Sequence, residues 1–367
     1  MKQFLVRILN FCIISILLFS TQTLAASEFF PNEPLTYANP NFTRPIPYDE
    51  RIKMLKAIEK NAQNVVKVFT LDDYGTPQGN RSLYAATVGT GPLKIWIQTG
   101  IRGNESFSSE VILKMLNTLG NDSTKETQMI LGQVTLYVVP IYNVDGYELN
   151  HTNTNAINEV SSIIKENLDL NDGLKIPLND QTDTFITEGF MPYYQYWCAL
   201  KPDFALDIRY QSIDDSNDLN DSPTFSMGIP LVPNGPVLSN LEEGYFNDVT
   251  RQIHGYVYHS LKDSGYDHIT RYQLKEYPSD PYNNILSAMM LGMNHKNLNP
   301  NRYSCPAVFF ETYGHAEKNN SIQPFDPNLT EQNLVALKAF LYGIVTGEVQ
   351  HIDPKYWDEI PYHVPKI

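Results

Sequence analysis

The stretch L-K-I-W-I-Q-T-G-I-R-G-N-E, residues 93–105, joins an apolar run to a polar turn and indicates how the chain folds. Its first six residues are typical of a strand, and the charged segment 101–105 follows almost directly. The segments D-I-R (207–209) and F-E-T-Y-G (310–314) likewise end the apolar runs 204–208 and 307–310. Because α/β sheets hold their ligands beyond the carboxyl ends of strands, we expect the chemistry of this protein at these three places.

Strand patterns and helix patterns alternate along the chain. Apolar periodicity predicts helices at 49–61, 106–119, 193–200, 241–262 and 330–346, and strands at 65–69, 83–88, 93–98, 134–139, 204–208 and 307–310. This order predicts an α/β protein with a largely parallel or mixed central sheet. We assign one domain to residues 49–350, preceded by an N-terminal segment, 26–48, and followed by a C-terminal tail, 351–367.

Residues 1–25 have the pattern of an export signal. Lys2 and Arg7 lie in or beside the short n-region before an apolar core at 11–19, and small residues around Ala25 offer a cleavage point. The apolar core is shorter than the roughly 20 residues of a membrane span. We therefore expect an exported protein, periplasmic or secreted, without membrane insertion after signal removal; a retained anchor is the alternative.

The charge balance excludes one class of partner. The chain has 41 acidic and 27 basic residues, a formal net charge of −14. Nucleic-acid binding depends on Lys and Arg side chains that neutralise phosphates, so this balance argues against it. The same excess of acids disfavours binding to an anionic membrane surface.

Two further segments lie between the three strand ends: N-V-D-G-Y (143–147) and D-L-N-D (169–172). In order and surroundings, the five segments resemble those of the zinc metallocarboxypeptidases of the carboxypeptidase A type. The resemblance covers roughly residues 45–345. It implies a carboxypeptidase A-like α/β sandwich, with a mixed central sheet and helices on both faces.

The resemblance also implies roles for individual positions. Positions 102, 105 and 209 correspond to the three zinc ligands, and position 311 to the general-base Glu. Positions 171 and 172 correspond to an Asn-Arg pair that anchors the substrate's terminal carboxylate. Such a site combines an open zinc coordination position, a carboxylate that takes a proton from the attacking water, and a bidentate Arg.

The sequence departs from this pattern at three of these positions. Arg102 and Arg209 stand where the zinc ligands would be His, and a guanidinium has no lone pair to offer a metal. Asp172 stands in place of the anchoring Arg, beside a retained Asn171. Glu105 and Glu311 keep the carboxylates of the family. We therefore expect no zinc or other cofactor.

The favoured hypothesis is a non-hydrolytic relative whose cleft binds peptide, a small anionic ligand or a protein partner, with Asn171, Asp172, Arg102 and Arg209 as candidate contacts. One alternative is an active zinc metallocarboxypeptidase or amidase that removes C-terminal residues, with zinc as its cofactor. Another is a metal-free hydrolase that uses Glu311 as its catalytic residue, with the arginines stabilising an oxyanion.

Two interpretations of the charged positions stay open. The arginines could neutralise Glu105 and Glu311 in a structural cluster with Asp172 nearby, because a buried charge without a partner is costly. Alternatively, the same arginines could bind a ligand.

Cys198 and Cys305 are the two cysteines outside the signal, and each precedes one of the later strand ends. The resemblance makes those strands parallel neighbours. We therefore expect the two cysteines to lie close enough for a disulfide, which requires Cα atoms within about 7 Å.

Overall fold

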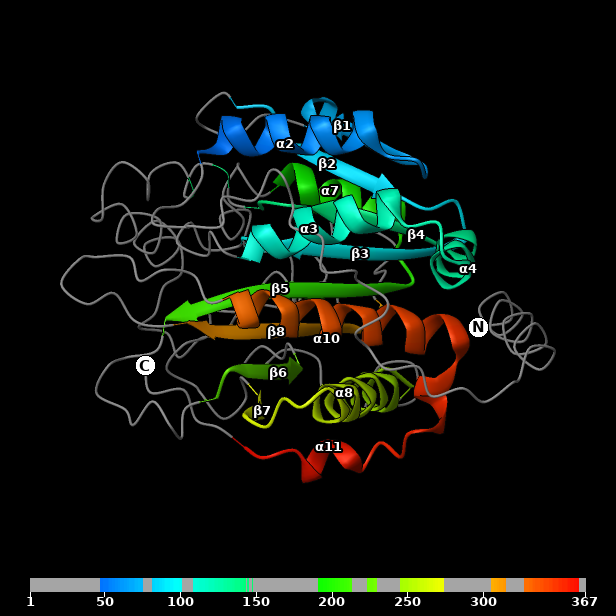
Figure 1. Cartoon of the computed structure of the whole chain (residues 1–367), viewed down its shortest axis with the longest axis vertical. Helices are drawn as coiled ribbons and strands as arrows, with labels where there is room; N and C mark the ends of the chain where they lie inside the picture. The colour runs from blue at the N-terminus through cyan, green and yellow to red at the C-terminus, as the bar shows by residue number, and fades with distance from the viewer. Residues whose placement is uncertain are drawn as a thin grey trace, which may run out of the picture.

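The structure is a computed structural model that describes residues 47–74, 81–100, 108–142, 144, 147, 191–212, 223–229, 245–273, 305–314 and 327–362. Its centre is one sheet of eight strands in the order β1-β2-β4-β3-β5-β8-β6-β7 (Figure 1). The strands are β1 (Val66–Thr70), β2 (Tyr84–Val88), β3 (Leu93–Thr99), β4 (Val134–Val139), β5 (Phe204–Ser212), β6 (Phe225–Ile229), β7 (Ile269–Gln273) and β8 (Ala307–Gly314).

The sheet is mixed. Strands β4, β3, β5 and β8 run parallel to one another, whereas β2 pairs antiparallel with β4 and β6 pairs antiparallel with β8. Parallel neighbours need long crossover connections, and helices supply them here. The expected α/β fold with a mixed central sheet is confirmed.

Helices lie on both faces of the sheet. In Figure 1, α3 and α10 lie in front of β3, β5 and β8, and α7 lies toward the opposite side. The helices are α2 (Tyr48–Asn61), α3 (Ser108–Asn121), α4 (Lys125–Gln133), α7 (Met191–Leu200), α8 (Tyr245–Asp263), α10 (Pro327–Thr346) and α11 (Tyr356–Glu359), with short 3-10 turns η2 (Asp72–Tyr74) and η6 (Glu348–His351).

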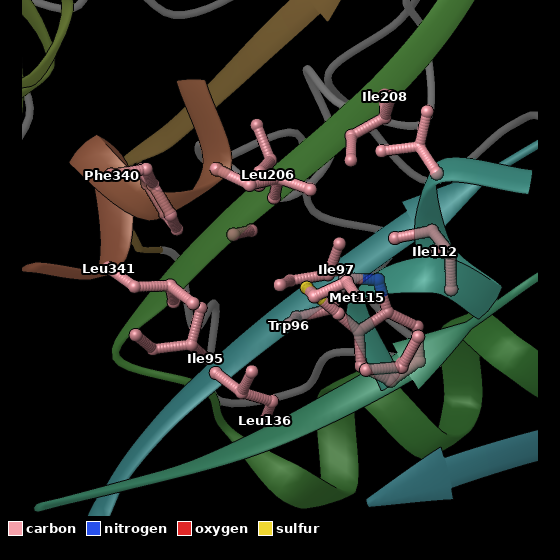
Figure 2. Close-up of a cluster of buried hydrophobic side chains, with 14 of the residues drawn as sticks. Ile95, Trp96, Ile97, Ile112, Met115, Leu136, Leu206, Ile208, Phe340 and Leu341 are labelled. Carbon is pink, nitrogen blue, oxygen red and sulfur yellow. The ribbon is translucent and has the colours of Figure 1, made fainter. Parts of the chain in front are cut away.

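Alternation along the strands divides the side chains between two layers. Ile97, Leu206 and Phe310 belong to the layer under α3 and α10, where Phe310 packs edge-on against Phe340 of α10 at 6.2 Å between ring centroids. Figure 2 shows this core around β3 and β5, with Ile112 and Met115 of α3 close by. We name this layer the α10 face and the opposite layer the α7 face, where Tyr196 of α7 contacts Trp96 of β3.

Strands β5 and β8 are longer than the sequence indicates. The predicted strands end at 208 and 310, but the pairing of β5 with β8 continues in register to Ser212 beside Gly314. The expectation that Arg209 and Glu311 follow their strands is therefore wrong. Each residue lies inside a strand, because the partner strand supplies backbone hydrogen bonds that sequence periodicity does not reveal.

The predicted helices over 49–61 and 330–346 are confirmed by α2 and α10, which differ from them by at most three residues at an end. Strands β6 and β7 and helices α4 and α11 have no counterpart in the sequence analysis. The expected neighbourhood of β5 and β8 is present, but Cys198 and Cys305 are both buried thiols rather than a disulfide. Burial and the nearby Asp203 carboxylate raise the pKa of Cys305 well above its usual value, which keeps this thiol protonated.

Within the described part of the chain, none of the helices has the length and apolar character that a membrane crossing requires.

Gly228 of β6 is required by the packing of the α7 face. It is paired in register with Phe309 of β8, and a Cβ built on Gly228 would lie 1.7 Å from the Phe309 ring. That separation is far inside van der Waals contact, and Phe309 is fully buried. The aromatic ring therefore occupies the space that any other residue at position 228 would fill.

We predict that Gly228→Ala lowers the free energy of unfolding by about 1–3 kcal/mol, the usual cost of overpacking a core. Gly132→Ala is the matched control, since nothing lies within 4 Å of its added methyl group in α4. We expect that control to be neutral or stabilising by up to about 1 kcal/mol, from helix propensity. Urea denaturation measures both; equal stability of the two variants would contradict this account of Phe309.

Candidate functional site

Three buried charged side chains lie on the α7 face where β5 and β8 run side by side. Asp207 and Arg209 belong to β5, Glu311 belongs to β8, and each is at most 2% exposed. Arg209 and Glu311 are partners in the parallel register, so their side chains leave the sheet on the same face. The sheet thus brings together two carboxylates and one guanidinium out of contact with bulk water.

Asp207 is the carboxylate that the structure places against Arg209. The two residues are two positions apart on β5, and Arg209 Nε lies 3.8 Å from Asp207 Oδ2. Both side chains are 1% exposed, so little water screens their attraction. A guanidinium at this depth needs a nearby negative charge, and Asp207 supplies one from the same strand.

Polar side chains extend the charged group in both directions across the sheet. On one side, Gln98 of β3 is in register with Asp207 and accepts a hydrogen bond from the Trp96 indole N–H at 2.8 Å. On the other side, Ser226 of β6 is in register with Glu311, and its hydroxyl lies 2.6 Å from that of Thr270 in β7. The result is a polar row through five neighbouring strands.

Aromatic side chains of α7 cover the adjoining part of the same face. The Tyr196 ring contacts those of Phe69, Trp96 and Tyr137 at centroid distances of 5.7, 6.1 and 6.4 Å. Burial raises the pKa of Tyr196 to about 12, so its phenol is neutral at physiological pH. The polar row therefore lies beside a layer of aromatic side chains on the α7 face.

A second buried ion pair fixes the start of α3, which follows the segment 101–107 in sequence. Arg51 of α2 contacts Glu110 in the first turn of α3 and also donates a hydrogen bond to the Tyr147 hydroxyl. Burial raises the pKa of the Glu110 carboxyl, and the Arg51 guanidinium opposes that shift. One arginine therefore holds α2, the first turn of α3 and residue 147 together.

The structure brings together two of the residues expected in the site, Arg209 and Glu311. Arg102, Glu105, Asn171 and Asp172 lie outside the described residues. Among the residues that are described, no group of three or more His, Cys, Asp or Glu side chains is arranged to hold a metal ion.

Asp207 as the partner of Arg209, and Gln98, Ser226 and Thr270 in the polar row, were not predicted from the sequence. The D-x-R spacing was a usable signal for Asp207, since residues two apart in a strand share a face. Ser226 and Thr270 had no such signal, because β6 and β7 were not predicted as strands.

We predict that Asp207→Asn lowers the free energy of unfolding by about 3–5 kcal/mol, because it removes a carboxylate from a buried guanidinium. Asp358→Asn is the matched control: Asp358 lies 3.0 Å from Arg251, but its side chain is 58% exposed. For such an exposed pair we expect the free energy of unfolding to change by less than about 1 kcal/mol. Equal effects of the two substitutions in urea denaturation would contradict a stabilising role for Asp207.

The chain shares its fold with solved carboxypeptidases. A metallo-carboxypeptidase from Burkholderia cenocepacia is 15% identical, with a TM-score of 0.53 over 83% of this chain and 70% of the other. A carboxypeptidase A from Helicoverpa armigera is 12% identical, with a TM-score of 0.53 over 88% of this chain and 79% of the other. At these identities the likeness concerns the fold.

The sequence itself matches the family model described as zinc carboxypeptidase over residues 52–173. No curated protein matches it. The matched segment includes the first strand end, 101–105, and both intervening segments, 143–147 and 169–172, on which the resemblance was based. Over this third of its length the chain is similar to the zinc carboxypeptidases, and its fold is that of the solved carboxypeptidases.

Proposed function

We propose that this protein is an exported, zinc-free member of the family that binds peptides or a protein partner without hydrolysing them. The observation that carries the proposal is the position of Arg209, buried on β5 between its strand neighbour Asp207 and its register partner Glu311. A fixed cation occupies the place that the family resemblance assigns to a neutral imidazole ligand.

The donor set does not fit zinc. Catalytic zinc takes its protein ligands from imidazole nitrogens and carboxylate oxygens. Arg209 has neither, and its guanidinium remains protonated at any ordinary pH and repels a divalent cation. The sequence places a second arginine, Arg102, at the other histidine position. A metal-dependent hydrolytic step is therefore not part of the proposed function.

The contact with Asp207 favours the structural interpretation of the arginine. A guanidinium reserved for a ligand would need an open approach and a weak internal partner. Arg209 is instead 1% exposed and lies beside a carboxylate on its own strand. In this proposal the charged group replaces the metal as the element that neutralises the buried carboxylates, and peptides bind without cleavage.

The family match supports one competing function, an active zinc carboxypeptidase that removes C-terminal residues. That enzyme would hold zinc through ligands that differ from the family pattern, and a chelator would abolish its activity. Metal content and chelator-sensitive release of C-terminal residues therefore discriminate between the two functions.

We predict far less than one zinc per chain after dialysis, measured by elemental analysis of the purified protein. Arg102→His/Arg209→His restores the ligand set His, Glu, His, and we expect this double variant to bind zinc. Little release of C-terminal residues should return until Asp172→Arg is added, because Asp172 repels a terminal carboxylate. Chelator-sensitive carboxypeptidase activity in the unmodified protein would overturn the proposal.

We predict that Arg209→Ala strands a buried carboxylate and lowers the free energy of unfolding by about 3–5 kcal/mol. Peptides with a free C-terminal carboxylate should raise the melting temperature of wild type and variant by the same amount. C-terminally amidated peptides serve as the control. Loss of the peptide-induced shift in the variant, with little loss of stability, would instead assign Arg209 to ligand binding.

A further inference from the structure

Residues 348–362, which we call the C-terminal strap, cover the β7 edge of the sheet. The backbone N–H of Arg271 in β7 donates to the Pro361 carbonyl at 2.8 Å, and Arg271 forms a parallel β-bridge with Tyr362. Because β7 is the last strand of the sheet, these contacts occupy a backbone edge that would otherwise be open to pairing. Figure 1 shows the strap, which includes α11, running below α8 at the end of the sheet.

The strap is fastened to α8 by contacts along its length. Tyr256 donates to the Glu348 carboxylate at 2.6 Å, Gln252 donates to the Ile352 carbonyl at 3.0 Å, and Arg251 pairs with Asp358 at 3.0 Å. These contacts are half-buried or exposed, so each contributes modestly. These polar contacts position the strap on α8, whereas the buried apolar contact of the strap is made by a different residue.

The apolar anchor of the strap is Trp357, which is fully buried. One neighbour is His254 of α8, with ring centroids 4.8 Å apart. The Arg271 guanidinium lies over the Trp357 ring at 5.4 Å and over the Tyr362 ring at 5.6 Å. Arg271 also donates to the Ile360 carbonyl at 3.0 Å. Three segments, α8, β7 and the strap, thus meet at one indole.

His254 is 0% exposed, and its Nδ1 lies 2.6 Å from the Thr250 carbonyl, one turn earlier in α8. Burial lowers its pKa to about 4 from an ordinary value of 6.5. The imidazole is therefore neutral in the folded protein at pH 7. It packs against Trp357 as an uncharged aromatic ring.

The charges around His254 do not favour a proton there. Arg251 lies on the same helix and lowers the pKa of His254 further, and the guanidinium of Arg271 lies over the Trp357 ring that His254 contacts. The strap contributes Asp358, which is largely exposed and paired with Arg251. The Thr250 and Gly228 carbonyls oppose the lowering of the His254 pKa by hydrogen bonding to the imidazole, but burial outweighs them. The other titratable side chains of these elements, within the described residues, are Asp248, Tyr256, Tyr258, His259, Lys262 and Asp263 on α8, Glu331, Lys338 and Tyr342 on α10, and Glu348, His351, Asp353, Lys355, Tyr356, Glu359 and Tyr362 on the strap, whereas β6 contributes none.

We propose that the strap is an acid-released latch, in which protonation of His254 detaches residues 352–362 from α8 and β7 while the central sheet stays folded. A proton on His254 adds a third positive charge near Arg251 and Arg271. Within the described residues the strap pairs with the sheet through one β-bridge, so it can move away while the paired strands stay in place. Release exposes Trp357 and lets water reach the imidazolium.

The direction of the pH dependence follows from the depressed pKa. Below pH 6.5 the released state binds a proton on His254 that the closed state excludes until about pH 4. The latch is therefore fully closed above pH 6.5, and its closure weakens progressively as the pH falls to about 4.

Hydrogen exchange of the full-length protein between pH 7 and pH 4 tests the proposal. Protection factors, corrected for the intrinsic pH dependence of exchange, are compared for the Arg271 amide and strap residues 352–362 against those of β5 and β8. We expect the strap and the Arg271 amide to lose at least tenfold in protection while β5 and β8 keep theirs. Loss of protection in all these segments at the same pH, or no loss in the strap, would overturn the latch.

His254→Phe keeps an aromatic ring against Trp357 and removes the titration. We expect its strap to stay protected to pH 4, whereas His259→Phe should behave as wild type, because His259 contacts Tyr356 at a more exposed place. His254→Leu gives a second non-titrating variant if the phenylalanine does not fold. Equal acid release in wild type and in a folded non-titrating variant would refute a role for His254.

Discussion

The parallel pairing of β5 with β8 is the constraint on which the rest of the site depends. Eight residue pairs run in register from Ala205 beside Ala307 to Ser212 beside Gly314. This register sends Leu206 and Phe310 into the core under α10 and sends Asp207, Arg209 and Glu311 to the opposite face. A slip of one residue would bury these charges in the apolar core, so the hydrophobic pattern of both strands fixes where the chemistry can be.

The sequence predicts the central sheet well because the apolar runs of β3, β4, β5 and β8 are buried on both faces. The ends of strands are harder to predict from the sequence. The last residues of β5 are polar, and they adopt a strand conformation only because β8 pairs with them. Strand β7 is an edge strand in which Thr270, Arg271 and Gln273 are polar without a regular alternation, so its sequence gives no clear strand period. Its structure comes from contacts with β6 and with the strap, which no local window of sequence contains.

The strap is a second element whose structure depends on contacts that a local window of sequence does not contain. Residues 351–362 contain two prolines and have no helical or strand period, so the sequence indicates only a C-terminal tail there. Their order in the structure depends on partners far away in the chain: His254 lies more than a hundred positions before Trp357. Of the charged site, the family resemblance placed Arg209 and Glu311 in one site, and the two are register partners in neighbouring strands, whereas Asp207 required the alternation of side chains along β5.

The strap and the polar row meet in β7. Thr270 faces the polar row through its hydroxyl contact with Ser226, and the next residue, Arg271, faces the strap on the other side of the sheet. One strand therefore separates the two features. If the strap leaves, β7 loses its outer backbone contact and keeps only β6 as a sheet partner. The Ser226–Thr270 contact is then the first link of the row to weaken, whereas Glu311, on a strand paired with both β5 and β6, stays fixed. Acid release of the strap would thus act on the β7 end of the row and leave the Asp207–Arg209 pair in place.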